Sequence, residues 1–245
     1  VDTDFTKSPI NAAGSKLRSR AAVHAVATVD GETFVAGNFS GSGISNVMKV
    51  GDNATALPDG GLNAEVQCMY QNGSMLYMGG NFSNTAENTV EGLNSVALFN
   101  TADNTWAALG AGVNGPVFSI IPVALNITSG VNETCLAVSG AFTTVNGFGD
   151  NKSFSTSGLA IWVLSAGNWL QNIPDAAISV DGRLTSYTYV DDFGPLFGGS
   201  LSSQLSGLSG ACELEGSGSP SLRSMGLKIQ PASSSSSGLS LIHIS

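Results

Sequence analysis

A short motif recurs four times along the chain and constrains the fold more than any other feature. In each copy, apolar residues lead into a glycine, followed by a small or polar residue, a bulky apolar residue and a serine or threonine. The first two of these glycines, Gly37 and Gly80, lie 43 residues apart. The four copies are Phe34–Ser40 (FVAGNFS), Leu76–Ser83 (LYMGGNFS), Leu136–Thr143 (LAVSGAFT) and Leu196–Ser202 (LFGGSLS). A period of this length indicates stacked structural repeats, in which each unit buries its apolar faces against its neighbours.

A second apolar stretch precedes each copy of the motif, and the two stretches together predict a β-hairpin. In the first two copies, Asp30-Gly31 and Asn72-Gly73 separate the stretches. These dipeptides favour tight hairpin turns because both positions tolerate positive φ. The third copy carries an insertion, Asn126–Thr134, which a hairpin loop can absorb at small entropic cost. The preceding stretches are Val23–Val29, Val66–Gln71, Val117–Val123 and Leu184–Val190.

Each unit continues beyond its glycine with a third apolar run, and two units then carry a tryptophan, Trp106 or Trp169. The third runs are Asn46–Val50, Ser95–Asn100, Gly158–Val163 and Gly210–Leu214. The pattern predicts an all-β fold, namely a β-propeller of kelch-like four-stranded blades. About four blades are expected here, as part of a larger or incomplete propeller. A β-sandwich with recurrent glycine turns is the alternative.

The repeated glycine is expected to serve the backbone. It permits either the close approach of another backbone segment or a β-bulge that turns the strand away. The aromatic residue two positions later, which is Phe39, Phe82 or Phe142, is then expected to pack between blades. We interpret these three side chains as core residues without a ligand role.

Composition narrows the possible partners and the organisation of the chain. Only 11% of the 245 residues are charged, 31 are glycine, and the net charge is −9. So few Lys and Arg residues argue against nucleic acid as a partner, and the scarcity of charge disfavours helical bundles. We expect a lead-in at 1–20, propeller repeats at 21–231, and a Ser-rich flexible tail at 232–245 that is consistent with non-native sequence.

The residues form no catalytic constellation, so we predict neither an enzyme nor a cofactor or metal site. The two histidines, His24 and His243, have no partners at metal-ligand spacing. A copper radical oxidase, the best-known enzyme on kelch-type blades, needs two histidines in the folded region and is excluded for that reason. We interpret the local charge clusters as solvated loops and a solvated linker. These clusters are Asp2 with Asp4, Asp191-Asp192, and Lys16 with Arg18 and Arg20.

Cysteines and asparagines bear on the cellular compartment. The three cysteines, Cys68, Cys135 and Cys212, are widely spaced and allow at most one internal disulfide. Asn-x-Ser/Thr sequons are weak evidence for secretion, and Asn38 and Asn81 can equally serve as turn residues of the repeat. The seven candidate N-glycosylation sites are Asn38, Asn53, Asn72, Asn81, Asn126, Asn132 and Asn151.

Six segments occur in a suggestive order between about Arg20 and Pro231: LYMGGNFSNT, GLNSVALFN, NTWAALGAGVNGPVFSI, CLAVSGAFTTVN, GLAIWVLSAGNWLQN and PLFGGSLSSQ. In this order they resemble the Rax-type cortical polarity landmark proteins of fungi, the bud-site-selection group. The resemblance implies a large, glycosylated parent protein with kelch-like repeats in its extracellular part and a single membrane span, which this segment lacks. It also implies a multi-pass Rax-type membrane partner and no catalytic residues. It favours use of the sequons on exposed loops, at Asn53, Asn126, Asn132 and Asn151.

We therefore expect a non-catalytic extracellular scaffold segment of a membrane-anchored fungal polarity landmark, which acts in bud-site selection and polarised growth. The parent protein would lie at the extracellular face of the plasma membrane, at cortical sites of growth or division, with the polarity machinery as its partner. The alternative is a secreted carbohydrate-binding or cell-wall adhesion propeller, in which Trp106, Trp162 and Trp169 would be stacking platforms for cell-wall glycans.

Overall fold

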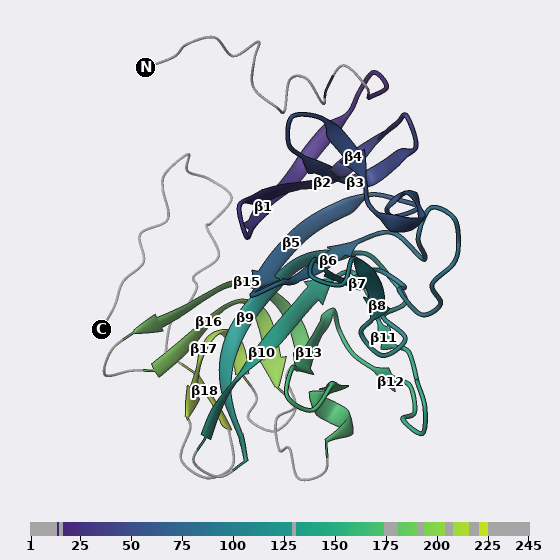
Figure 1. Cartoon of the computed structure of the whole chain (residues 1–245). Coiled ribbons are helices and arrows are strands. Elements are labelled where there is room, and N and C mark those ends of the chain that lie inside the picture. The colour runs from purple at the N-terminus through teal and green to yellow at the C-terminus, as the bar shows by residue number, and fades with distance from the viewer. Residues whose placement is uncertain are drawn as a thin grey trace, which may run out of the picture.

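Four antiparallel sheets of four strands each follow one another along the chain (Figure 1). The computed structural model describes residue 14 and residues 17–128, 131–173, 181–190, 194–203, 208–215 and 221–224. The first sheet comprises β1 (Ala22–Val29), β2 (Glu32–Gly41), β3 (Ile44–Val50) and β4 (Ala54–Ala56). The second comprises β5 (Val66–Asn72), β6 (Met75–Gly80), β7 (Val96–Asn100) and β8 (Thr105–Ala108).

The third and fourth sheets repeat this plan with one insertion. The third sheet comprises β9 (Val117–Thr128), β10 (Val131–Gly140), β13 (Leu159–Val163) and β14 (Asn168–Trp169). A two-stranded ribbon, β11 (Thr144–Val145) with β12 (Phe154–Ser155), is inserted between β10 and β13. The fourth sheet comprises β15 (Asp181–Val190), β16 (Gly194–Ser203), β17 (Leu208–Glu215) and β18 (Ser221–Ser224). Short 3-10 helices, η2 (Pro58–Gly60) and η3 (Leu170–Asn172), follow the first and third sheets.

Each sheet is a meander that opens with the hairpin expected from the motif. The strand orders are β1-β2-β3-β4, β5-β6-β7-β8, β9-β10-β13-β14 and β15-β16-β17-β18. Asp30 and Gly31 both adopt positive φ, at 50° and 83°, in the turn of the first hairpin. The insertion in the third copy lengthens the β9–β10 hairpin, where Asn126 pairs with Asn132. The all-β class and the four-stranded repeat are confirmed, whereas a closed propeller ring stays a prediction.

A β-bulge recurs at the same place in all four hairpins. The pairing register slips opposite the motif glycine, so that the first strand of each sheet carries one residue without a partner. In the first sheet, Val23 pairs with Gly37 and Ala25 with Ala36, which leaves His24 as the extra residue. The equivalent residues in the other sheets are Gln67, Phe118 and Thr185.

The bulge explains why the motif requires glycine. It brings the backbone at the start of the first strand against the second strand. A Cβ atom on Gly37, Gly80 or Gly140 would overlap the carbonyl oxygen of Ala22, Glu65 or Pro116 respectively. The oxygen belongs to the backbone, so a side chain at these positions could be accommodated only by shifting a strand. Both expected roles of the glycine, the bulge and the close approach, are therefore confirmed.

Apolar side chains between successive sheets form the core. One cluster joins the first and second sheets and includes Phe34, Leu62 and Leu76. A second cluster joins the second and third sheets, and a third cluster extends from the third sheet to Leu184 of β15. The first strands of neighbouring sheets also contact one another, β1 with β5, β5 with β9 and β9 with β15. Each internal sheet is thus covered by its neighbours on both faces, as a stacked repeat requires.

The aromatic residues of the motif are buried, as expected. Phe39, Phe82 and Phe142 are 4%, 1% and 2% exposed. Phe82 lies in the cluster between the first and second sheets, and Phe142 in the cluster between the second and third. Phe39 packs on a further cluster of the first sheet together with Leu17. Among the described residues, no helix is long and apolar enough to cross a bilayer.

Replacing Gly80 with alanine is expected to destabilise the protein by about 1–3 kcal/mol, the usual cost of forcing atoms into a packed site. The added Cβ would overlap the carbonyl oxygen of Glu65. Gly51→Ala is the matched control, because a Cβ on Gly51 would have no atom within 4 Å. Urea unfolding of both variants measures the difference, and equal midpoints would contradict the close approach.

Candidate functional site

The histidines and charge clusters named in the sequence analysis do not form a metal or acid–base cluster in the part of the chain that the structure describes. No group of three or more His, Cys, Asp or Glu side chains able to hold a metal ion occurs among those residues. Asp2, Asp4, Lys16, Asp191, Asp192 and His243 lie outside the described residues.

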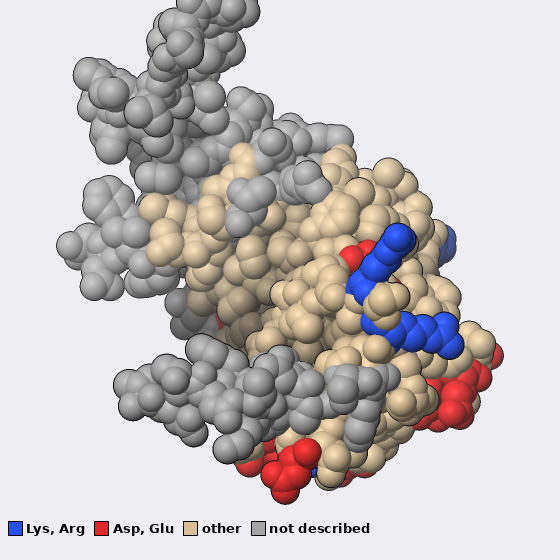
Figure 2. All heavy atoms as spheres, turned by 90° about the horizontal axis from the view of Figure 1, so that it is seen from above, with Lys and Arg blue, Asp and Glu red and all other residues tan. Residues whose placement is uncertain are grey.

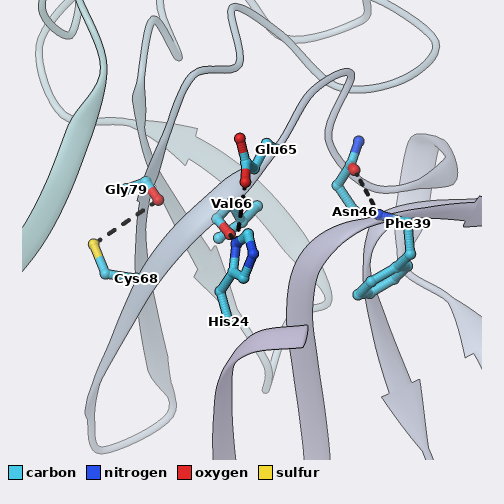
Figure 3. A network of polar contacts seen from close by, with 7 residues as sticks. All are labelled: His24, Phe39, Asn46, Glu65, Val66, Cys68 and Gly79. Atoms are coloured by element: carbon cyan, nitrogen blue, oxygen red, sulfur yellow. Dashed lines mark hydrogen bonds and ion pairs between the residues drawn. The ribbon is translucent and has the colours of Figure 1, made fainter. Parts of the chain in front are cut away.

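His24 occupies the bulge of the first sheet and contacts the second sheet (Figure 3). Its Nδ1 lies 3.0 Å from the carbonyl oxygen of Val66 and 3.3 Å from Oε1 of Glu65. A carbonyl oxygen only accepts hydrogen bonds, so Nδ1 carries the hydrogen that is donated to Val66. His24 therefore ties the bulge of β1 to the start of β5.

The three tryptophans are core residues, so they cannot be the sugar platforms of the alternative function. Trp106, Trp162 and Trp169 are 9%, 8% and 0% exposed. The indole Nε1 of Trp106 donates to the carbonyl oxygen of Pro58 at 3.0 Å and fixes the connection between the first two sheets. Trp162 and Trp169 pack edge to face with ring centroids 5.0 Å apart. The Nε1 atom of Trp169 is buried and has no hydrogen-bond partner within the described structure.

The described sequons are accessible at the surface. Asn38, Asn53, Asn72 and Asn81 are exposed, and Asn151 is half-buried. Asn38 lies within β2 and Asn72 ends β5, whereas Asn81 directly follows β6. Asn126 and Asn132 are placed by their backbones in the β9–β10 hairpin, and their side chains lie outside the described atoms.

Burial favours the protonated form of the two described thiols. Cys68 and Cys135 are free cysteines, and burial raises the pKa of each from 9.0 to about 12. The backbone carbonyl of Gly79 accepts a hydrogen bond from Cys68 at 3.8 Å, and Glu133 adds to the shift at Cys135. Burial, with a smaller contribution from Tyr70, also raises the pKa of Tyr77. Thiols that remain protonated at neutral pH are poor nucleophiles and poor metal ligands.

A pocket of about 620 Å³ lies between the first and second sheets. One wall is the segment that leads into β1, which carries Arg18 and Arg20. The opposite wall is the segment that leads into β5, which carries Asn63 and Glu65. The lining residues are Arg18, Ser19, Arg20, Ala21, Asn38, Phe39, Ser40, Ser45, Asn46, Asn63, Ala64, Glu65 and Asn81. Sequence reasoning interpreted Arg18 and Arg20 as a solvated linker and missed this pocket, because its two walls are far apart in the chain.

The side-chain amides of Asn46 and Asn63 hold the floor and one wall of this pocket in place. Asn46, only 8% exposed, accepts a hydrogen bond from the Phe39 backbone N–H at 3.1 Å (Figure 3). Its Nδ2 donates to the carbonyl oxygen of Leu62 at 2.9 Å, which links the two sheets. On the opposite wall, Oδ1 of Asn63 accepts from the backbone N–H of Ser83 at 3.0 Å. The fold thus holds the side chains of Asn46 and Asn63 in place.

Charged side chains are sparse on the surface seen in Figure 2, where blue groups lie together beside a small red patch and further red patches lie toward the edge. Among the described cations, Lys49 is paired with Glu32. Arg18 and Arg20 have no ion pair with a described residue, and both are exposed on the pocket. Two guanidinium groups without an ion pair to a described residue therefore lie on this pocket, in a chain of net charge −9.

The fold and the surface define an all-β repeat protein made of stacked four-stranded sheets, with a polar pocket between two of them. The chain is 41% identical, over 97% of its length, to the polarized growth protein L1 of Phoma sp. (strain ATCC 20986 / MF5453). It is 32% identical, over 64% of its length, to the polarized growth protein rax2 of Schizosaccharomyces pombe. The resemblance predicted from the sequence is confirmed, and the chain belongs to the Rax-type family of fungal polarity proteins.

The chain spans 18% and 14% of the lengths of these two relatives. A scan of family models finds no match, and a search of solved structures finds none either.

The two described thiols are expected to resist alkylation in the folded protein. At pH 8, iodoacetamide should label Cys68 and Cys135 only after unfolding, because burial raises both pKa values to about 12. Peptide mass spectrometry before and after denaturation measures the labelling at each site. Rapid labelling of Cys135 in the folded state would contradict its burial.

The same thiols make stability depend on pH. An unfolded thiol titrates near pH 9.0 and these folded thiols near pH 12, so the unfolded state loses protons first as the pH rises. Their contribution to stability is therefore complete below pH 9 and is lost progressively between pH 9 and pH 12. Urea unfolding at pH 8 and pH 10 should show lower stability at pH 10, and a Cys68→Ala/Cys135→Ala variant should show a smaller decrease.

Proposed function

We propose that this chain is a non-catalytic extracellular scaffold segment of a membrane-anchored protein that marks cortical sites for polarised growth. The observation that carries the proposal is the 41% identity to a polarized growth protein over 97% of the chain. A second polarized growth protein, from a different fungus, matches 64% of the chain. Both relatives are named for polarised growth, and this supports a role of the same kind here.

The architecture supports a scaffold role. Stacked sheets produce a rigid body whose loops can present binding surfaces, and each sheet depends on its neighbours for its core. The described part of the chain gathers its buried side chains into packing clusters between sheets. Its two described thiols are kept protonated by burial, so they do not offer a nucleophile.

The surface supports an extracellular location. Two sequons outside the pocket carry exposed asparagines, at Asn53 and Asn72, and N-glycans attach to such accessible sites in secreted proteins. Exposed Ser, Thr and Asn side chains provide polarity where charge is scarce, since charged residues make up only 11% of the chain. A multi-pass membrane protein of the same polarity system is the partner that we propose for the parent protein.

A fold-breaking variant of the full-length parent protein tests the polarity role in its native cell. A fluorescent tag on the wild type should concentrate at growth sites. Gly80→Asp with Gly140→Asp should abolish this pattern and randomise growth-site choice, because both residues contact a backbone carbonyl too closely for any side chain. Gly51→Ala should behave as the wild type. An even surface distribution of the wild type, with unchanged growth-site choice after deletion of the gene, would refute the proposal.

Endoglycosidase treatment tests the extracellular location separately. Protein isolated from the native cell should shift to lower apparent mass on treatment, and Asn53→Gln should lose part of that shift because Asn53 is exposed. Gln71→Asn, which changes an exposed residue without creating a sequon, is the control. The absence of any shift in the wild type would contradict passage through the secretory pathway.

A further inference from the structure

The pocket between the first and second sheets exists because the first sheet departs from the repeat. The second and third sheets join their second and third strands by long connections, 81–95 and 141–158. Backbone bridges hold these connections against the segments leading into the sheets, Leu62 with Thr85 and Val113 with Val145. In the first sheet, Ser42 and Gly43 are the whole connection between β2 and β3. The space that a longer connection would fill is therefore left as the pocket.

Arg20 occupies a place that asparagine holds in the next two sheets. Counting back three residues from the bulge pairs of β1, β5 and β9 leads to Arg20, Asn63 and Asn114 respectively. Oδ1 of Asn114 accepts from two successive backbone N–H groups at 2.9 Å, and Asn63 makes the same contacts in its own sheet. An arginine has no acceptor and cannot form this cap.

The backbone of Arg20 is also unusual. Its φ is 72°, a region that residues other than glycine, asparagine and aspartate seldom adopt. Unfavourable backbone conformations of this kind gather at ligand sites, so an observed outlier is a reason to suspect one. The first sheet has therefore exchanged a structural cap for an exposed guanidinium group at the edge of a cavity.

We propose that this pocket binds an anionic saccharide, whose carboxylate or phosphate group is held by Arg18 and Arg20. Guanidinium groups form paired hydrogen bonds with such anions, and a planar fork suits them better than an ammonium group. The volume of about 620 Å³ lies within the roughly 300–1,000 Å³ range of small-molecule pockets. Glu65 on the opposite wall accepts hydrogen bonds, as sugar hydroxyls require.

The rest of the lining favours a sugar over an acidic peptide. Serine and asparagine side chains surround the two arginines, and those of Asn38 and Asn81 have no hydrogen-bond partner among the described residues. Such groups complement hydroxyls on several sides of a ring. Phe39, the one aromatic residue of the lining, is 4% exposed, so the pocket offers little apolar surface to anchor a peptide side chain. The proposal does not depend on the polarity role, because it concerns binding by the isolated chain.

Binding by the full chain, produced in bacteria so that Asn38 and Asn81 carry no glycan, tests the proposal. Isothermal titration would use trigalacturonate for the carboxylate, mannose 6-phosphate for the phosphate, maltotriose as the neutral sugar and tetra-aspartate as the acidic peptide. At least one anionic sugar should bind, more weakly as salt is added, and it should bind more tightly than maltotriose and tetra-aspartate. Binding of trigalacturonate would identify a carboxylate as the anionic group, and binding of mannose 6-phosphate would identify a phosphate.

Arg20→Asn is the decisive variant, because asparagine is the residue that this place carries in the next two sheets. It should weaken binding about tenfold or more while leaving the melting temperature equal or higher. Lys152→Asn removes the same charge from an exposed position outside the pocket and should leave binding unchanged. Arg18→Ala provides a second variant if Arg20→Asn does not fold.

Three outcomes would overturn the proposal. One is that neither anionic sugar binds to a chain that melts cooperatively. Another is that Arg20→Asn and Lys152→Asn bind the anionic sugar equally well. The third is that tetra-aspartate binds as tightly as the sugars, which would mean that the two arginines recognise charge without recognising hydroxyls.

Discussion

Every part of this structure depends on the burial of sheet faces against neighbouring sheets. A single four-stranded meander has two apolar faces and cannot cover both by itself. Here Phe34 and Leu76 of the first and second sheets share one cluster, and Val117 and Phe142 belong to the next. A change in one sheet is therefore felt by the sheets on either side. The low charge of the chain follows from the same constraint, because most strand positions face another sheet.

The bulge and its glycine allow this stacking. In the first three sheets, the extra residue of the first strand brings its backbone against the motif glycine, where no Cβ could fit. Gly79, which precedes the motif glycine Gly80 in β6, packs against the neighbouring sheet instead. A Cβ on Gly79 would lie 2.5 Å from a methyl group of Val117. Gly79 and Gly80 thus form a doublet in which one residue serves the hairpin and the other serves the packing between sheets. A glycine doublet occurs in two of the four copies, at Gly79-Gly80 and Gly198-Gly199, and a single glycine occurs in the other two.

The pocket shows how a repeat gains a specific site. In its floor, the buried side chain of Asn46 joins the first sheet to Leu62 of the segment that leads into the second. What differs is the short β2–β3 connection and the arginine in place of a capping asparagine. A local loss of repeat symmetry therefore creates a concave, polar surface without a change in the stacking of the sheets. His24 and Glu65 lie beside it and hold β1 to β5.

The sequence by itself determined the class of fold, the four hairpins, the third strands and the structural role of the repeated glycine. These features depend on contacts that are local in sequence, such as the Asp30-Gly31 turn and the alternation of apolar residues around it. The Rax-type resemblance also came from the sequence, through the order of its motifs. Only the tertiary structure decided that Arg18 and Arg20 face Asn63 and Glu65 across a pocket. These residues are brought together by the stacking of two sheets. The residue pattern of one repeat does not say which residues of the next repeat it will contact.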